Sequence, residues 1–368
     1  MRKLRAQLFM VTAALLAIGV VMVYSASAIN AHEFLGDSAY YLKRQLLYLF
    51  IGVIASLMIM SADYDVLKKY VKPVLIITFI LLILVLIPGI SREIAGARRW
   101  FRFSFLSFQP SQVAKLVMIL YFADFLSRKH GDIRSFWEGF MPPMIMLGVS
   151  VGLILLEPDL GTAVAISIVS FIMLFVAGMK LAHLVPMIVG SIPILLVLIL
   201  HKAYRMRRIT AFLDPWKDPQ GVGFQIIQSF IALGSGGLLG VGLGQSRQKL
   251  LYLPGCHTDF IFSIIGEELG LLGAGAVIIL FVLFIWAGFR IALRARDLFG
   301  HLAALGIVSM IALEAIINIA VATGSMPTKG LPLPFISYGG SSLVFDMIGV
   351  ALLLNIAKYS ETPYEKEQ

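Results

Sequence analysis

The segment around Asp259 combines residue types and a spacing that suit acid–base chemistry. Asp259, Ser263 and Glu267 are four residues apart, so on one unbroken helix they would lie on the same face. A carboxylate at the start of such a helix could act as a general base. Thr258 or Asp259 could instead cap the helix, with a buried polar ladder behind the cap. The spacing alone leaves both interpretations open.

Two opposing effects act on the pKa of Asp259. The partial positive charge of a helix N-terminus would lower that pKa, and removal from water beside lipid would raise it. His257 is a rival base, because an imidazole ordinarily titrates near neutral pH, or else it is a loop residue without a catalytic role. Its neighbour Cys256 is the single cysteine of the 368-residue chain, which excludes an internal disulfide and indicates no metal site.

Cationic side chains elsewhere could bind a phosphate. Arg98 and Arg99 beside Trp100 offer guanidinium groups for bidentate contacts, although Arg and Trp also anchor membrane proteins at the level of the headgroups. Lys115 follows Pro110, which suits the first turn of a helix. Both interpretations of the Arg-Arg-Trp run stay open.

The run 323–342 holds three prolines and four glycines, which exclude a helix. Non-helical backbone at membrane depth persists only inside protein or along a water-filled cavity. Lys329 in this run could hold a phosphate, and Ser341 near its end is a further candidate substrate contact. A re-entrant plug without chemistry would have the same composition.

A tight turn is predicted from Glu157 to Thr162, with Pro158 and Gly161 as turn residues. Asp159 and Thr162 can cap the following helix, and capping alone would explain most of this segment. Glu157 is harder to explain, because a carboxylate at the membrane edge is costly unless it is paired or used. It is therefore a candidate site residue.

Apolar segments position all of these residues. The chain is 59% hydrophobic and 14% charged, with mean hydropathy +0.90, whereas a soluble domain is usually about 45–50% apolar and about 25% charged. A membrane-spanning helix needs about 20 apolar residues. Ten spans are predicted, at 8–29, 45–61, 72–88, 111–127, 138–156, 161–177, 181–200, 261–289, 302–323 and 342–357. We expect an all-α polytopic membrane protein, one domain over 1–368, with a large extracytoplasmic loop (201–260) between helices seven and eight.

An even number of spans places both termini on one side of the membrane. Over the short loops, Lys and Arg are about twice as frequent on that side, so the positive-inside rule makes the termini cytoplasmic and brings the four polar segments to the outer face. A removable signal peptide is the alternative for the N-terminus, since basic residues precede an apolar run and Ala26-Ser27-Ala28 resembles a cleavage site.

Several other functions are not indicated. The net charge of +9 does not favour nucleic acid, because the basic residues form short clusters between apolar runs and suit anionic headgroups. The glycines between Gly234 and Gly244 fit neither G-x-G-x-x-G nor a P-loop, and no zinc signature is present. No cofactor is certain, although a divalent cation (Mg or Mn) could serve a reaction at a pyrophosphate.

Together these segments resemble the SEDS family (shape, elongation, division and sporulation) of bacterial membrane proteins. The runs that carry the resemblance extend over nearly the whole chain: Gly96-Ala97-Arg98-Arg99-Trp100, Glu157-Pro158-Asp159-Leu160-Gly161-Thr162, His257-Thr258-Asp259-Phe260 and Ser337-Tyr338-Gly339-Gly340-Ser341-Ser342. The runs 327–330 and 265–270 resemble the division branch of that family more than the elongation branch. Gly255-Cys256 departs from the family, which more often has an acidic residue after the proline.

The resemblance implies a glycosyltransferase of the bacterial inner membrane that polymerises the peptidoglycan precursor lipid II at the outer face. In that reaction the 4-hydroxyl of an acceptor N-acetylglucosamine attacks the anomeric carbon of a donor N-acetylmuramic acid, and undecaprenyl pyrophosphate leaves. The implied catalytic residue is Asp259, as general base. The candidate substrate contacts are Arg98, Arg99, Lys115, Glu157, His257, Glu267, Lys329 and Ser341. The implied partners are a class B penicillin-binding protein with transpeptidase activity and other division proteins.

Two alternatives stay beside the enzyme. A lipid II flippase would use the polar residues inside spans, which are Lys115, Asp124, Glu314, Asn318 and Asp346. Transporters often have repeated halves with broken helices, and the sequence shows no such repeat. A division scaffold without catalysis would have no need of Asp259.

Overall fold

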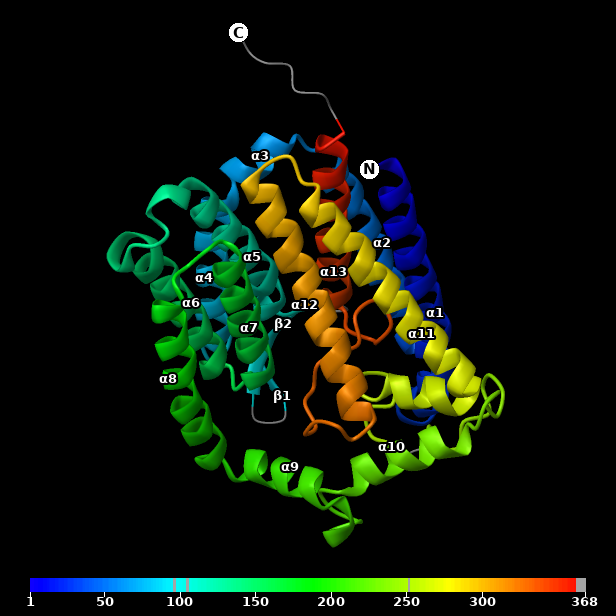
Figure 1. Ribbon diagram of the computed structural model, residues 1–368. Coiled ribbons are helices and arrows are strands. Elements are labelled where there is room, and N and C mark those ends of the chain that lie inside the picture. Colours follow the sequence, from blue (N-terminus) through cyan, green and yellow to red (C-terminus); the bar gives the residue numbers. More distant parts are fainter. Residues whose placement is uncertain (95–96, 104–105, 251, 362–368) are drawn as a thin grey trace.

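The computed structural model is a bundle of long helices with a small sheet and short helices gathered at one end (Figure 1). It describes residues 1–94, 97–103, 106–250 and 252–361. The helices of the bundle are α1 (Arg2–Leu35), α2 (Tyr40–Ser61), α4 (Val71–Leu86), α5 (Pro110–Arg128), α6 (Met141–Leu156), α7 (Leu160–Val176), α8 (Leu181–Leu200), α11 (Ile261–Leu293), α12 (Leu298–Ala322) and α13 (Ser341–Tyr359). Each predicted span coincides with one of these helices, which confirms the polytopic all-α fold.

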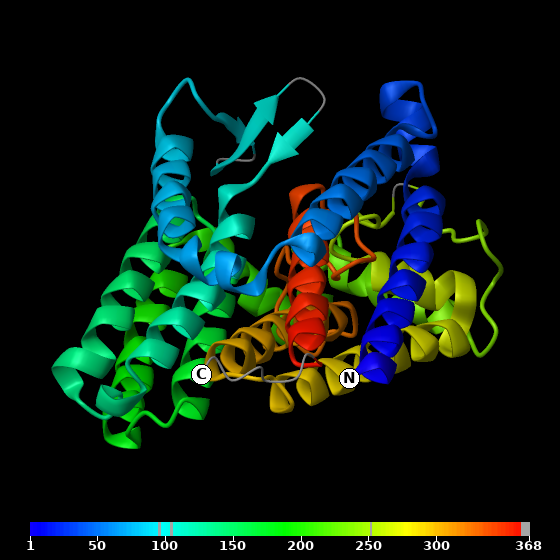
Figure 2. The same cartoon turned by 90° about the horizontal axis from the view of Figure 1, so that it is seen from above.

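The bundle has a buried centre and an exposed apolar surface. Among the described residues, seven helices are long and apolar enough to cross a membrane, and α4 and α7 are shorter apolar helices. Most side chains of α12 and α13 are buried, and Figure 2 shows these two helices between the α4–α7 group and the pair α1 and α11. In contrast, almost every side chain of α8 is exposed at the edge of the bundle. Such an apolar exterior is what lipid requires.

Both described chain ends lie at the same end of the bundle. Arg5 near the start of α1 pairs with Glu361 just after α13 at 3.1 Å. The short helix α3 (Tyr64–Lys69) lies at this end too, where Lys68 and the Tyr64 hydroxyl bind the Asp297 carboxylate. The α5–α6 connection contains the short turns η1 (His130–Asp132) and η2 (Phe136–Phe140). The assignment of this end to the cytoplasm stays a prediction.

The N-terminal segment is an integral part of the bundle. α1 packs along α11 and α2, and Ala26 and Ser27 of the suspected cleavage site are fully buried in this packing. A removed signal peptide would take these contacts with it.

The opposite end, here called the site end, contains secondary structure where the sequence indicated only loops. Strands β1 (Arg92–Ile94), β2 (Ala97–Phe103) and β3 (Leu106–Phe108) form an antiparallel sheet in the order β1-β2-β3. The loop 201–260 contains α9 (Ala203–Leu213), η3 (Pro215–Lys217) and α10 (Phe224–Ser235), which lie across the site end (Figure 1). These helices are too short to span a bilayer, and their one-sided apolar faces suit an interfacial position.

α11 is broken close to its start. Gly270 has φ 66° and ψ −167°, and the carbonyl groups that the break frees accept 3.0 Å hydrogen bonds from the N–H groups of Val241 and Gly242. A Cβ on Gly240 would lie 2.2 Å from the Glu268 carbonyl oxygen, and one on Gly270 would lie 2.3 Å from the Gly240 nitrogen. The glycine-rich part of the outer loop is therefore fastened to the break by main-chain atoms alone.

Candidate active site

Asp259 lies half-buried in the turn before α11. The prediction that Thr258 or Asp259 caps this helix is wrong: Phe260 is the N-cap residue, and none of the described side chains caps it. The Thr258 hydroxyl donates instead to the Gly255 carbonyl at 3.2 Å. Burial raises the pKa of Asp259 to about 6, against the opposing effect of the Arg208 charge. A carboxylate that caps no helix and has this pKa is suited to accept a proton near neutral pH.

Arg208 of α9 belongs to the site although no sequence motif singles it out. Its Nη1 donates to the Thr328 carbonyl at 3.2 Å, and its positive charge acts on Asp259. The available signal is the grouping of Arg205, Arg207 and Arg208 in a short amphipathic segment, which is typical of an interfacial helix. Composition alone places that segment in a long loop.

The 323–340 segment is non-helical, as predicted, and contacts the Asp259 carboxylate through Gly330. A Cβ at Gly330 would lie 3.2 Å from the Asp259 Oδ2 atom. Burial lowers the pKa of the neighbouring Lys329, and the charge of Asp159 opposes that shift. Lys329 is thus a cation held near two of the predicted polar segments.

The turn after α6 joins three of the four polar segments. Asp159 caps α7 as predicted, since its Oδ1 accepts from the Thr162 N–H at 3.2 Å. The Asp159 Oδ2 accepts from the Gln109 side-chain amide at 3.3 Å. The Gln109 N–H donates to the Ser341 hydroxyl at 3.1 Å. Ser341 is therefore buried in a structural contact at the start of α13, and its role in substrate binding stays a prediction.

Arg99 fastens the sheet to this turn. Its Nε donates to the Glu157 carbonyl at 2.7 Å, and its Nη2 donates to the Pro158 carbonyl at 2.6 Å. Arg98 lies half-buried beside it on β2. The structure thus gives Arg99 a positioning role, and phosphate binding by Arg98 and Arg99 stays a prediction.

Glu157 is fully buried, and neither of its carboxylate oxygens has a hydrogen-bond partner among the described residues. Burial raises its pKa to about 9, the Asp159 charge adds to that effect, and the Arg99 charge opposes it. A carboxyl group with this pKa is protonated at neutral pH and can donate a hydrogen bond. Glu157 is therefore a neutral acid buried in the turn after α6.

We expect Glu157→Gln to stabilise the protein at pH 8 and to have little effect near pH 4.5. The folded-state pKa of about 9 exceeds the ordinary value of 4.5, so the wild type loses stability as the pH rises between these values, because only the unfolded state releases the proton. Glutamine has no such proton to lose. The measurement is thermal unfolding of both proteins in detergent over this pH range. The exposed Glu138 provides the control Glu138→Gln, and an equal response of both variants to pH would contradict the prediction.

His257 is less suited than Asp259 to the role of base. Its ring lies 4.5 Å from that of Tyr41, measured between centroids, and its carbonyl accepts from the Tyr338 N–H at 2.9 Å. Burial lowers the pKa of His257 to about 4, so the ring is neutral and weakly basic at pH 7. The Asp259 pKa of about 6 lies closer to the working pH, which favours Asp259.

The polar stripe expected along α11 is not continuous. Asp259 precedes the helix, and the Ser263 hydroxyl lies 2.6 Å from that of Ser229 on α10. Glu267 is buried and accepts hydrogen bonds from the Ser246 hydroxyl at 2.5 Å and the Arg247 N–H at 2.9 Å. Glu267 therefore holds the outer loop against α11, and the expectation that it lies on one face with the Asp259 carboxylate is not met.

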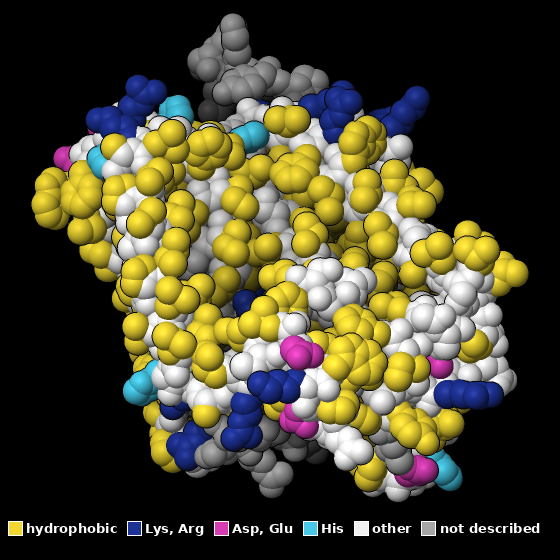
Figure 3. All heavy atoms as spheres, turned by 60° about the horizontal axis from the view of Figure 1, so that its bottom comes forward, with side chains coloured by type: hydrophobic (Ala, Val, Ile, Leu, Met, Phe, Trp, Pro, Cys, Tyr) yellow, Lys and Arg dark blue, Asp and Glu magenta, His cyan; other side chains and the backbone are white. Residues whose placement is uncertain are grey.

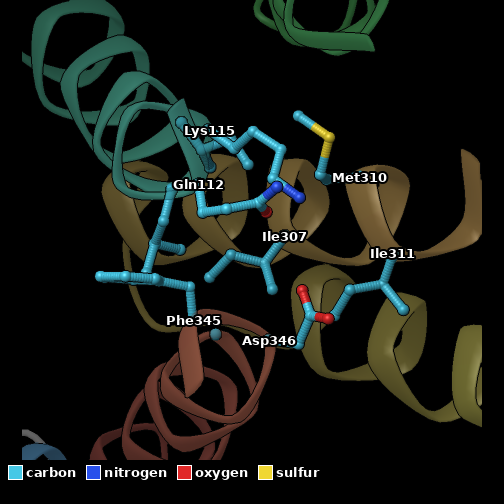
Figure 4. A pocket seen from close by; sticks show the side chains of 10 residues that line it. Gln112, Lys115, Ile307, Met310, Ile311, Phe345 and Asp346 are labelled. Carbon is cyan, nitrogen blue, oxygen red and sulfur yellow. The ribbon is translucent and has the colours of Figure 1, made fainter. Parts of the chain in front are cut away.

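Lys115 lies inside the bundle rather than at its surface. It forms a buried ion pair with Glu314 of α12. Lys115 and Gln112 of α5, with Asp346 of α13, line a small pocket whose other walls are largely apolar (Figure 4). Two carboxylates thus accompany one ammonium group in the centre of the protein.

The surface of the site end is mixed in character. Figure 3, which brings this end forward, shows Lys and Arg side chains gathered with Asp and Glu low on this face, below a broad field of hydrophobic side chains. Across the part of the chain that the structure describes, no group of three or more His, Cys, Asp and Glu side chains is placed to bind a metal ion. A divalent cation held partly by the substrate's phosphates stays a prediction, and no step is assigned to one.

The fold and the site define a multi-pass membrane protein with a buried carboxylate, several cations and a neutral acid collected at one end. The chain belongs to the family described as cell cycle protein, whose family model unites FtsW, RodA and SpoVE and matches residues 5–362. This is the SEDS family, and the identification made from the sequence is confirmed.

Two relatives with different names are similar over nearly the full length. The probable peptidoglycan glycosyltransferase FtsW of Trichlorobacter lovleyi is 46% identical over 95% of this chain and 92% of its own. The stage V sporulation protein E of Bacillus subtilis is 48% identical over 96% of both chains.

Solved structures show the same fold. RodA of Thermus thermophilus, a rod shape determining protein, superposes with a TM-score of 0.72 at 30% identity over 97% of both chains. A chain from a peptidoglycan synthase complex, solved to show the structural coordination of polymerization and crosslinking, gives a TM-score of 0.78 at 32% identity, over 97% of this chain and 98% of that one.

Proposed function

We propose that this protein is a peptidoglycan glycosyltransferase that polymerises lipid II, with Asp259 as the general base. The observation that carries the proposal is the state of that carboxylate: half-buried, free of any helix cap and with a pKa raised to about 6. The activity for which the FtsW relatives are named, at 46% and 47% identity, supports the same reaction.

The proposed reaction forms one bond and breaks one. The acceptor 4-hydroxyl oxygen bonds to the anomeric carbon of the donor, whose bond to the pyrophosphate oxygen breaks. Asp259 takes the hydroxyl proton, and undecaprenyl pyrophosphate leaves with the bonding electrons. A half-buried carboxylate whose pKa lies about one unit below neutral pH is ionised at rest and basic enough to share the proton in the transition state.

Cations at the site end would stabilise the departing pyrophosphate. Arg208 and Lys329 are near Asp259 through the 328–330 segment, and Arg98 lies on the sheet that Arg99 fastens to the turn at Glu157. Preorganised positive groups in a site with little water stabilise developing negative charge more strongly than water does. Neutral Glu157 adds a hydrogen-bond donor without adding negative charge.

An apolar cavity of about 220 Å³ offers a place for the polyprenyl chain of the substrate. Its walls come from α2, α3, α4, α5, α12 and α13, and they include Tyr64, Val74, Leu120 and Phe299. Leu116 and Phe345 line both this cavity and the pocket around Lys115. A hydrocarbon chain gains free energy roughly in proportion to the apolar area that it buries, so this cavity supports an isoprenoid-linked substrate.

The proposal includes an orientation and a partner. We place the chain ends in the bacterial cytoplasm and the site end at the outer face of the inner membrane, where the transpeptidase domain of a class B penicillin-binding protein could take up the glycan product. Similarity to a chain of a peptidoglycan synthase complex that coordinates polymerization with crosslinking supports a transpeptidase partner. Because a relative named FtsW and one named for sporulation are about equally similar, a role in division rests on the runs 327–330 and 265–270.

The proposal is tested by incubating labelled lipid II with the purified protein in complex with its cognate transpeptidase. A ladder of glycan products on a gel, insensitive to blocking of the transpeptidase active site, is the expected result. A verified complex that yields no ladder would overturn the proposal and favour the flippase, for which transfer of lipid II between leaflets of a vesicle is the direct assay.

The rate of polymerisation is expected to depend on pH through Asp259. Because the base must be ionised, the rate should fall about tenfold for each unit of pH below about 6, the pKa of Asp259. It should be level from about 7 upward until another group titrates. The measurement is the initial rate at saturating lipid II between pH 4.5 and 8, with protein stability checked at each pH. A rate independent of pH over this range would contradict the assignment of Asp259 as base.

A further inference from the structure

The carbonyl groups of the turn that carries Asp259 are held by three different donors. The His257 carbonyl accepts from the Tyr338 N–H at 2.9 Å, and the Thr258 carbonyl accepts from the Ser337 hydroxyl at 2.6 Å. The Asp259 carbonyl accepts from the Asn318 side-chain amide at 3.0 Å. Asn318, unlike the other two donors, belongs to a long helix, α12, so it connects the turn to the rigid centre of the bundle.

The same amide group also holds the 323–340 segment. The Nδ2 of Asn318 donates to the Leu331 carbonyl at 2.8 Å, directly after Gly330, which packs on the Asp259 carboxylate. Arg208 holds the other side of this short stretch through the Thr328 carbonyl. One buried side chain therefore joins the residue that bears the base to the stretch that bears Lys329.

The orientation of the Asn318 amide follows from its surroundings. Both contacts are carbonyl oxygens, which only accept hydrogen bonds, so the NH₂ group must face them. Asn318 is buried, and a buried carbonyl left without a donor is costly. Loss of this amide would release two carbonyls at once, on the two segments whose separation sets the distance between Asp259 and Lys329.

We propose that Asn318 is a positioning residue of the glycosyltransferase, which sets the distance of the Asp259 carboxylate from the cationic 328–331 stretch. Asn318 touches no reacting atom and acts through the main chain of Asp259 and Leu331. The expected effect of Asn318 on the rate rests on the proposed function. Its expected effect on structure rests on the two hydrogen bonds alone. Misplacement of a catalytic group by about 1 Å can lower a rate about 100-fold.

The chain offers a matched control in Asn355 of α13. Its Nδ2 likewise donates to two carbonyls, those of Ile59 at 2.8 Å and Ala62 at 2.9 Å, and it is buried to a similar degree. These contacts lie near the end of the bundle that carries the chain termini. Asn318→Leu and Asn355→Leu therefore make the same chemical change at the two ends of the protein.

The experiment compares the two variants with wild type, in the complex with the transpeptidase, by hydrogen–deuterium exchange and by polymerisation rate. Asn318→Leu should raise exchange in peptides covering 255–260 and 327–333 together, and lower kcat about 100-fold with a much smaller change in KM. Asn355→Leu should raise exchange only around 55–62 and leave kcat within about threefold of wild type. Both variants should lower the melting temperature by similar amounts.

Three results would overturn the inference. Unchanged exchange at 255–260 or at 327–333 in Asn318→Leu would show that the amide does not join them, whether or not the wild type polymerises. Equal losses of kcat in the two variants would show a general effect of stability. Raised exchange at both segments with kcat unchanged would show a purely structural contact. A wild type that yields no ladder, with exchange raised at both segments, would refute the proposed reaction while the structural link stands.

Discussion

Asp259→Asn is expected to reduce the rate of lipid II polymerisation by about 10²–10⁴-fold, the usual contribution of a general base. Asparagine keeps the size of the side chain but cannot take a proton from the acceptor hydroxyl. The variant should fold normally, because burial penalises the negative charge of this carboxylate, which asparagine lacks, and α11 does not depend on Asp259 for a side-chain cap. Substrate binding should change little, so the loss should appear in kcat rather than in KM.

The control for this variant is Asp214→Asn, which removes one negative charge from an exposed position after α9 in the same outer loop. Initial rates at saturating lipid II, with melting temperatures recorded for each protein, separate chemistry from folding. A rate for Asp259→Asn within about threefold of wild type, well below the expected loss, would show that another group accepts the proton.

Lys115→Met is expected to destabilise the protein by about 3–5 kcal/mol, as removal of one partner from a buried ion pair typically does. The loss of Lys115 would leave the buried Glu314 carboxylate without its ion-pair partner and would remove the cation from the small pocket that Asp346 lines. Glu314→Gln should cost much less, because Lys115 would keep Asp346 as a neighbour in that pocket. The double variant should be less destabilised than the sum of the two single variants, since they share one interaction.

The comparison is made by reversible unfolding of each variant in detergent micelles. Lys129→Met is the matched control, because Lys129 pairs with Asp132 at 3.3 Å and both side chains are about half exposed, where such pairs contribute about 0–1 kcal/mol. Equal costs for Lys115→Met and Glu314→Gln would show that Asp346 does not interact with the lysine.

Sequence patterns predicted the bundle well because membrane helices obey a strong physical rule. Each span must satisfy its own backbone hydrogen bonds and present apolar side chains to lipid, so long apolar runs identify the ten bundle helices with little ambiguity. The cap of α7 was also predictable, because Asp159 and Thr162 have the local spacing of a helix start. The short helices α9 and α10 were not predicted from the sequence, because an interfacial helix needs only one apolar face and no minimum length.

The polar segments of the site could be predicted from the sequence, but the contacts between them could not. The polar residues of four segments were recognisable as unusual in an apolar chain, and the structure brings these segments together. The break at Gly270 could not be foreseen. The start of α11 after Asp259 was also unforeseen, and for that reason the predicted stripe from Asp259 to Glu267 along one helix face was wrong. Arg208 and Asn318 reach the site through contacts between segments distant in sequence, which no local pattern records.

The main-chain contact between Gly240 and Gly270 limits how this corner of the protein can evolve. Each glycine is required by the backbone of the other segment, so no compensating side-chain change at one position makes room for a Cβ at the other. A single substitution of Gly240 or of Gly270 is therefore not tolerated. A lineage can alter this corner only by resizing the 236–249 stretch, and divergence there should proceed by insertion, deletion or recombination while Gly240 and Gly270 stay constant.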